Sequence, residues 1–186
     1  MQNLLTGKAQ VAIIGRSLTA QEVKTVLKVD SVYPKELLMA KDAVALVTGK
    51  AGSLQSLNYE QFLNDLKTGN SSYNLVFDSK QSGVVRSFDF LASANGKTLF
   101  ALDSMDAVID YVNAHDNAIG LLPYAKFSDE FNPEMQQLLT KIKIIPLEMI
   151  DSSGQKLRIS ASQSEIALND YPLIRPINYI IANPKE

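Results

Sequence analysis

The stretch from Val11 to Glu22, VAIIGRSLTAQE, sets the pattern of the fold. Four apolar residues in a row predict a short buried strand, and Gly15 ends it. Thr19 and Glu22, three residues apart, have the spacing of a capping box at the start of a helix. The apolar positions Val23, Val26 and Leu27 give that helix, over residues 20–28, one buried face. A strand followed at once by a helix is a βα unit, the building block of α/β folds.

The rest of the chain repeats this alternation of strand and helix, without internal repeats or low-complexity tracts. Asn58, Ser82 and Ser104 each precede an amphipathic helical pattern and are good N-cap residues. The sequence therefore predicts an α/β fold throughout. Strands are expected at 37–48, 74–77, 99–102, 118–123 and 174–181, helices at 58–68, from 82, from 104 and at 131–141, an extended segment at 142–150 and a turn at 151–155.

Asp42 interrupts the apolar strand predicted at 37–48. A carboxylate inside such a strand is costly to bury unless it finds partners. Asp42 therefore predicts a crossing point between strands or a hydrogen-bonded hinge.

Composition excludes several classes of function. The 186 residues hold 18 basic and 20 acidic side chains, a balance that disfavours nucleic acid and anionic lipid as partners. The chain has no cysteine and one histidine, which removes thiol nucleophiles, disulfides and Cys-based zinc sites. No apolar run approaches the roughly 18 residues of a membrane-spanning helix, and the first residues, MQNLLTGK, do not have the pattern of a signal peptide.

Catalytic residues are scarce. His115 lies in a polar segment, where an exposed loop histidine is the simpler interpretation. Because it is the one histidine of the chain, the sequence disfavours a Ser-His-Asp triad at Ser82. The carboxylate pairs Asp103 with Asp106 and Asp129 with Glu130 are common at helix starts and surface turns. No metal-ligand spacing emerges. The sequence thus predicts a protein that is not an enzyme and that has no cofactor.

Three predicted strand-to-helix turns end in a hydroxyl cap: residues 15–19, 78–83 and 103–104. Helix N-termini carry unpaired N–H groups and the positive end of the helix dipole, so turns that converge would suit an oxyanion. The alternative is that these residues are N-caps and nothing more. Arg86, four residues after Ser82 on the same helix face, is either a cation for that anion or a surface arginine. Arg16 allows the same two interpretations.

Six segments of the chain form a pattern in a fixed order: VAIIGRSLTAQE at 11–22, KDAVALVT at 41–48, YEQFLNDLKTG at 59–69, VFDSKQSGVVR at 76–86, AIGLLPY at 118–124 and YPLIRPINYIIAN at 171–183. In this order they resemble segments of the phosphate-binding proteins of ABC importers, which are type II periplasmic binding proteins. The resemblance covers nearly the whole chain, and its most specific parts are the YPLIRP segment and the AIG strand.

This resemblance implies a two-lobed type II periplasmic-binding-protein-like fold that holds its ligand between the lobes. We expect residues 1–49 and 171–186 to form lobe 1 and residues 50–170 to form lobe 2. The family's first two βα units have no counterpart before Met1, so lobe 1 is expected to be incomplete.

The resemblance implies site residues, which we compare with this sequence position by position. The family's Ser-Gly-Thr helix start matches Ser82 and Gly83, with Val84 in place of the threonine. Asp78 stands where an arginine is frequent, and Gly15 stands where some members have an acidic residue. The predicted ligand-binding set is Gly15, Arg16, Ser17, Asp78, Ser79, Ser82, Gly83, Val84, Arg86 and Ser104.

The sequence thus predicts a solute-binding protein for a small oxyanion, with inorganic phosphate favoured. By resemblance it would deliver the ligand to the membrane permease of an ABC importer, from the periplasm or as a cell-surface lipoprotein. The main alternative is a degenerate member that binds no ligand and acts as a protein-interaction module, and a phosphate-processing enzyme is the third interpretation. Self-association through the incomplete lobe is a further expectation.

Overall fold

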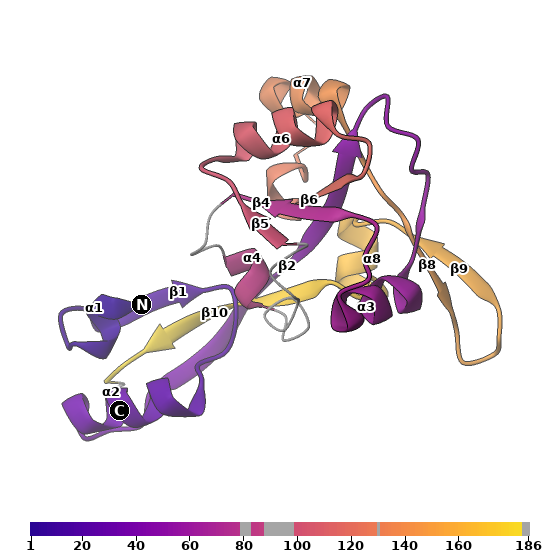
Figure 1. Ribbon diagram of the computed structural model, residues 1–186. Coiled ribbons are helices and arrows are strands. Elements are labelled where there is room, and N and C mark those ends of the chain that lie inside the picture. The colour runs from indigo at the N-terminus through magenta and orange to yellow at the C-terminus, as the bar shows by residue number, and fades with distance from the viewer. Residues whose placement is uncertain (79–82, 88–98, 130, 184–186) are drawn as a thin grey trace. The chain divides into compact units, whose positions relative to one another are not determined.

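The computed structural model describes residues 1–78, 83–87, 99–129 and 131–183, and the side chains of Val85 and Arg86 lie outside the description. The chain divides into two compact units (Figure 1). Unit 1 comprises Met1–Asp42 and Arg175–Glu186, and unit 2 comprises Ala43–Ile174. Strand β2 (Lys35–Gly49) contributes residues to both units, and so does β10 (Ile174–Ile181) by its first residue.

Unit 1 is a small layered structure. Its strand order is β1-β10-β2, with β1 (Val11–Ile14) antiparallel to β10 and Ile13 opposite Tyr179. The C-terminal strand thus pairs with the first strand of the chain. Two helices, α1 (Gln2–Leu5) and α2 (Ala20–Asp30), complete the unit. The buried residues of its core are Leu4, Val26, Ile180 and Ala182.

The start of α2 shows why this segment is helical. Thr19 Oγ1 accepts a hydrogen bond from the Glu22 N–H at 3.2 Å, and the Glu22 carboxylate accepts one from the Thr19 N–H at 2.9 Å. The predicted capping box is thus confirmed. The helix continues two residues beyond the predicted end and stops where Ser31 takes a left-handed conformation.

Unit 2 is built on a sheet in the order β2-β6-β4-β5, with β7 also pairing with β2. Strands β5, β4 and β6 are parallel to one another, whereas β6 and β7 run antiparallel to β2. In Figure 1, α6 and α7 lie next to each other over this sheet. The elements are α3 (Tyr59–Thr68), β4 (Asn74–Phe77), α4 (Gly83–Arg86), β5 (Leu99–Ala101), α6 (Met105–Ala114), β6 (Ala118–Pro123), η1 (Tyr124–Lys126), α7 (Pro133–Lys141) and β7 (Ile142–Ile144).

A second, three-stranded sheet in unit 2 has the order β3-β8-β9. Its strands are β3 (Leu57–Asn58), β8 (Leu147–Ile150) and β9 (Lys156–Ile159), and α8 (Gln163–Leu168) follows. The segment predicted as extended at 142–150 is thus two strands in two different sheets, because Ile145 and Pro146 interrupt it. The predicted turn at 151–155 joins β8 to β9, and Asp151 Oδ1 accepts hydrogen bonds from the Ser153 and Gln155 N–H groups.

The core of unit 2 is much larger than that of unit 1. It joins 28 buried apolar residues, from Ala43 in β2 to Leu173 before β10. Residues 35–41 of β2 are all exposed, whereas residues 42–49 are all buried. Among the described residues, no helix combines the length and apolar character needed to cross a bilayer.

Candidate functional site

The carboxyl ends of the three parallel strands of unit 2 meet at one edge of its sheet. Phe77, the last residue of β4, is opposite Ala101 in β5 and Leu121 in β6. Asp78 therefore leaves the sheet between two neighbouring strands. Ser104 follows β5 by three residues, so it is carried to the same edge. In open α/β sheets, this edge is where ligands bind.

Asp78 has an unusual environment at this edge. Its side chain is half-buried, and its Oδ1 atom is buried without a hydrogen-bond partner among the residues that the structure describes. A buried acceptor that lacks a donor costs about 1–3 kcal/mol. A ligand that presents an O–H or N–H group would remove this cost.

Ser104, Gly83 and Val84 differ in what they can offer. The exposed Ser104 accepts a hydrogen bond at Oγ from the Ala107 N–H at 3.2 Å, as an N-cap of α6, which leaves its hydroxyl proton to donate. Gly83 is exposed at the start of α4. Val84 is 1% exposed and packs in the core, so only its backbone can face a ligand. Ser79, Ser82 and the side chain of Arg86 lie outside the described residues.

The other predicted residues, 15–17, form the loop after β1 in unit 1. Arg16 makes a two-pronged ion pair with Glu22, in which both nitrogen-to-oxygen distances are 2.7 Å. The hydrogen bonds between the two side chains raise the pKa of Arg16. They are also the main reason that the pKa of Glu22 falls to about 2. The charge of Arg16 is therefore matched within its own unit.

Asn178 in β10 holds this loop in place through hydrogen bonds. Its Nδ2 donates to the backbone oxygen of Arg16 at 3.2 Å and to Glu36 Oε1 at 2.6 Å. Glu36 Oε2 in turn accepts from the Leu18 N–H at 3.2 Å. Ser17 Oγ lies 3.4 Å from the same Asn178 nitrogen. The loop is thus held by residues of its own unit.

Gly15 lies next to a buried ion pair that the sequence alone did not reveal. Arg175 donates from Nε and Nη2 to Asp42 Oδ2 at 3.0 and 2.7 Å, and both residues are buried. A Cβ atom on Gly15 would lie 3.2 Å from Arg175 Nη1. Glycine at this position therefore leaves room for the guanidinium. The hydrogen-bonded partner predicted for Asp42 is confirmed, and it is Arg175.

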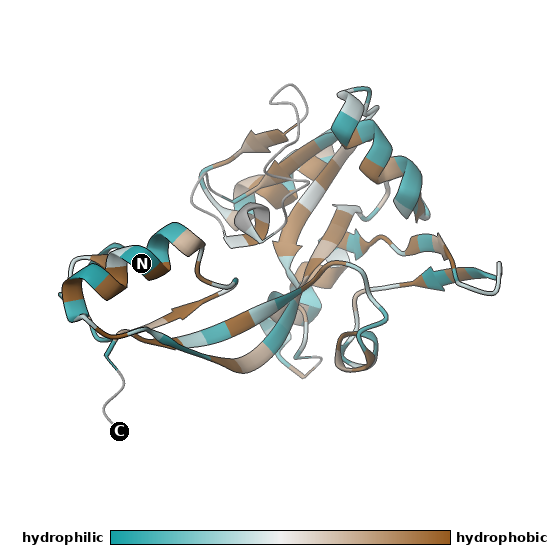
Figure 2. Ribbon diagram, turned by 90° about the horizontal axis from the view of Figure 1, so that it is seen from below, coloured by the Kyte–Doolittle hydropathy of each residue, from teal (hydrophilic) through white to brown (hydrophobic). Residues whose placement is uncertain are grey.

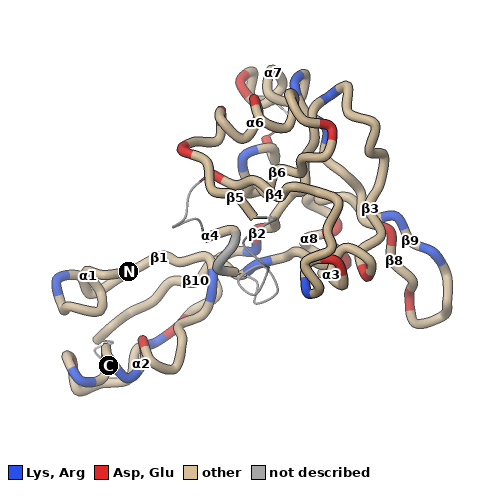
Figure 3. The backbone as a smooth tube through the Cα atoms, in the orientation of Figure 1, with Lys and Arg blue, Asp and Glu red and all other residues tan. Residues whose placement is uncertain are grey.

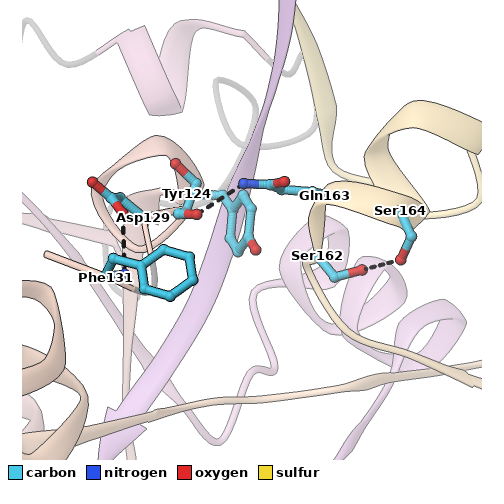
Figure 4. A pocket seen from close by; sticks show the side chains of 7 residues that line it. Tyr124, Asp129, Phe131, Ser162, Gln163 and Ser164 are labelled. Carbon is cyan, nitrogen blue, oxygen red and sulfur yellow. Dashed lines mark hydrogen bonds between the residues drawn. The ribbon is translucent and has the colours of Figure 1, made fainter.

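A pocket of about 530 Å³ lies between η1 and α8 of unit 2, and sequence reasoning did not identify it (Figure 4). Gln163 Nε2 donates to the Ser128 carbonyl at 2.8 Å, and the hydroxyls of Ser162 and Ser164 are 3.0 Å apart. None of its described lining residues is basic, and one is a carboxylate, so it does not suit an anion. The lining residues are Tyr124, Ser128, Asp129, Phe131, Ser162, Gln163 and Ser164.

The comparisons with known proteins agree with this architecture. The profile of the PBP superfamily domain matches residues 1–186, so the chain belongs to that family of periplasmic-binding-protein domains. The predicted α/β type II periplasmic-binding-protein-like fold is confirmed. No curated protein matches the chain.

Several solved structures share the fold at low sequence identity. One is assigned as a phosphate ABC transporter substrate-binding protein from Clostridium perfringens, with phosphate bound; it has 16% identity and a TM-score of 0.67, over 97% of this chain and 69% of that one. An ABC-type phosphate transport receptor from Vibrio cholerae has 18% identity and a TM-score of 0.67, over 100% of this chain and 72% of that one. PstS from Borrelia burgdorferi has 17% identity and a TM-score of 0.55, over 97% and 70%.

Proposed function

We propose that this chain is a solute-binding protein for a small oxyanion, with phosphate as the favoured ligand. The single observation that carries the proposal is Asp78, whose buried Oδ1 lacks a donor among the described residues at the carboxyl edge of β4. The similarity to the Clostridium perfringens and Vibrio cholerae proteins supports phosphate as the ligand.

Asp78 gives the site a way to distinguish anions. Monohydrogen phosphate carries one O–H, which can donate to the carboxylate, whereas sulfate carries none at neutral pH. A carboxylate that faces a fully ionised anion repels it, so Asp78 would favour phosphate and disfavour sulfate.

Donors for the remaining phosphate oxygens belong to the predicted set. In this proposal the Ser82 and Ser104 hydroxyls and the backbone N–H groups of Gly83 and Val84 donate to the anion. Arg86 supplies the cation, and charge-assisted bonds of this kind contribute about 1.5–3 kcal/mol each. Gly15, Arg16, Ser17 and Ser79 complete the proposed ligand set, with Arg16 already paired to Glu22.

The proposed role is transport rather than catalysis. The protein would present its ligand to the membrane permease of an ABC importer, in the periplasm or at the cell surface. The rival proposal is a family member that binds no ligand and serves as a protein-interaction module. The ion pair of Arg16 with Glu22 favours this rival, because it already neutralises one of the two cations in the proposed ligand set.

Calorimetric titration of the purified chain with phosphate and with sulfate separates the two proposals. We expect the native chain to bind phosphate at least tenfold more tightly than sulfate. Asp78→Asn should weaken phosphate binding by about 10- to 100-fold, a loss of one charge-assisted hydrogen bond, while sulfate binding stays equal or improves.

The matched control is Asp116→Asn, which removes the same charge from an exposed residue just before β6, at the opposite end of the parallel strands. It should change phosphate affinity by less than about twofold, because an exposed charge is screened by salt. Equal losses in both variants would contradict the role of Asp78. Absence of binding to either anion by the native chain would favour the interaction module.

A further inference from the structure

The pocket between η1 and α8 lies at the carboxyl end of a parallel strand. Helix η1 begins at Tyr124, directly after β6 ends at Pro123. Leu121 of β6 is opposite Phe77, the last residue of β4, so Tyr124 leaves the sheet at the same edge as Asp78. Ligands of open α/β sheets bind at this edge. No residue that lines the pocket belongs to the proposed anion-binding set, so a ligand of the pocket would be a different one.

The lining of the pocket is polar, unlike the sheet that leads to it. Figure 2 shows the strands of the larger unit mostly in brown, the hydrophobic colour, and Figure 3 shows β6 without a charged residue. Six of the seven described lining residues of the pocket carry a hydroxyl, amide or carboxylate group. Its volume of about 530 Å³ is within the range of roughly 300–1,000 Å³ that small-molecule sites occupy.

The pocket has a half-buried floor and an exposed rim. Tyr124, Ser128 and Ser162 are half-buried, whereas Phe131 and Gln163 are exposed. Figure 4 shows Tyr124 between Phe131 on one side and Ser162 on the other. A pocket of this form holds one part of a ligand and leaves the rest in solvent.

The rim offers hydrogen-bond acceptors. Asp129 Oδ1 accepts a hydrogen bond from the Phe131 N–H at 3.1 Å. The other carboxylate oxygen, Oδ2, accepts none from the residues that the structure describes, and the same holds for Gln163 Oε1. Both oxygens can therefore accept hydrogen bonds from a ligand.

The pocket also offers hydrogen-bond donors. Gln163 Nε2 uses one N–H on the Ser128 carbonyl and has a second N–H to donate. The Ser162 and Ser164 hydroxyls are 3.0 Å apart, so one of their two protons lies between them and the other remains. A matching ligand thus has groups that donate and groups that accept.

Phe131 adds an apolar component at the rim. Its side chain is 92% exposed, the largest value among the exposed hydrophobic residues of the described chain. A single exposed apolar residue is ordinary on a protein surface. At the mouth of a polar pocket, however, an open aromatic ring can pack against the C–H groups of a ligand and remove apolar area from water.

We propose that this pocket binds a short neutral saccharide. Sugar hydroxyls both donate and accept hydrogen bonds, which matches the mixed set of groups, and the C–H face of a sugar ring matches Phe131. An amine offers donors only, which would leave the donors of Gln163 and the serines without partners. The exposed Asp129 attracts a cation only weakly, because salt screens it.

Chemical-shift titration of the ¹⁵N-labelled chain tests the proposal with maltotriose, cellotriose and triacetylchitotriose as probes. At least one of the three should shift the amide signals of Asp129 and Gln163, with a dissociation constant on the order of 1 mM because the pocket is open. Phe131→Ala should weaken that binding at least fivefold. Gln163→Ala should weaken it at least threefold.

The matched control is Tyr33→Ala, which removes another exposed aromatic ring, 68% exposed and in unit 1. It should leave saccharide affinity unchanged within about twofold, and so should raising sodium chloride from about 50 to 500 mM, since the ligand is neutral.

Three results would overturn the proposal. The first is the absence of binding by all three saccharides at about 20 mM, and the second is equal effects of the substitutions at 33 and 131. The third is binding of spermidine, weakened by salt, at the same amides in place of the saccharides, which would assign the pocket to cations. None of the saccharide probes carries an anionic group, so this outcome is separate from that of the phosphate titration.

Discussion

Glu22 serves two partners at the first turn of α2. Its carboxylate accepts hydrogen bonds from both terminal nitrogens of Arg16 and from the Thr19 N–H. These contacts favour the ionised carboxylate, which is why the pKa of Glu22 falls to about 2 from an ordinary value near 4.5. One side chain therefore holds both the loop after β1 and the start of the helix.

This low pKa makes part of the stability depend on pH. A carboxyl group with a depressed pKa in the folded state stabilises the protein above its unfolded pKa, and that contribution is lost as pH falls toward the folded value. For Glu22 the window runs from about pH 4.5 down to about pH 2. We expect Glu22→Gln to cost about 1 kcal/mol at pH 7, after allowance for solvent screening of a partly exposed pair.

Urea unfolding at a series of pH values checks this. The difference between the native chain and Glu22→Gln should shrink steadily between pH 4.5 and pH 2. Glu60→Gln, which alters an exposed acid in the first turn of α3, is the control. A difference that stays constant with pH would show that the ion pair is not its cause.

Asp42 shows how much the sequence alone predicts about the surroundings of a single residue. A carboxylate among apolar strand residues has to find a partner, so the need was predictable from its neighbours. The identity of that partner was not, because Arg175 is 133 positions away. Only the register between β2 and β10 brings the two together, and local sequence does not encode that register.

Strand β6 has a tight packing constraint at Gly120. A Cβ atom on Gly120 would lie 2.7 Å from Val47 Cγ2 and 2.9 Å from Val108 Cγ1. Real side chains do not approach so closely, so β2 and α6 can pack onto β6 only where β6 has no side chain. The packing of β2 and α6 thus explains the glycine of the AIG strand.

We expect Gly120→Ala to lower the free energy of unfolding by about 1–3 kcal/mol, the usual cost of overpacking a core. The test is a double-mutant cycle with Val47→Ala, measured by chemical denaturation. Removing the Val47 methyl groups should relieve part of the clash, so the double variant should be more stable than the sum of the two losses predicts. Strict additivity would place the cost of Gly120→Ala elsewhere.

Helix starts were the most predictable elements. Thr19, Asn58 and Ser104 were each expected to cap a helix, and each does, because a cap depends on residues three positions away. The helix expected at 131–141 begins at Pro133 instead, since Asn132 is its cap. The strands β8 and β9 were harder to predict, because their pairing depends on a second sheet rather than on local pattern.

The residues of the candidate site also differ in how far the sequence predicts their surroundings. The placement of Asp78 and Ser104 at one edge of the sheet was predictable because each lies in the loop after a parallel strand. The pairing of Arg16 with Glu22 was not predicted, although both residues lie in the first stretch considered. The sequence pattern explains Glu22 as part of the capping box alone. In the structure Glu22 also forms the ion pair with Arg16.

At the scale of the whole molecule, the two units differ in how much apolar surface they bury. The core of unit 1 has four buried residues, against 28 in the main core of unit 2. Since burial of apolar area is the main stabilising contribution to folding, unit 2 should be the more stable unit.

Native-state hydrogen exchange measures this difference. The amides of Leu75–Phe77 and Ala118–Leu121 should exchange at least tenfold more slowly than those of Val11–Ile14. Edge and central strands differ in exchange, so β10, which lies between two strands of unit 1, provides the comparison within that unit. Slower exchange in β1 and β10 than in β4 and β6 would reverse the expected order.

The ion pair between Asp42 and Arg175 bears on how unit 2 is inserted into the sequence of unit 1. The first segment of unit 1 ends at Asp42 and its second segment begins at Arg175, and these two residues are in direct contact. On the other side of each crossing, the Val44 N–H donates to the Leu173 carbonyl at 2.9 Å, so the two ends of unit 2 are also neighbours. Unit 2 therefore has the arrangement of an inserted domain whose two ends lie next to each other, the arrangement in which one domain is tolerated within the sequence of another.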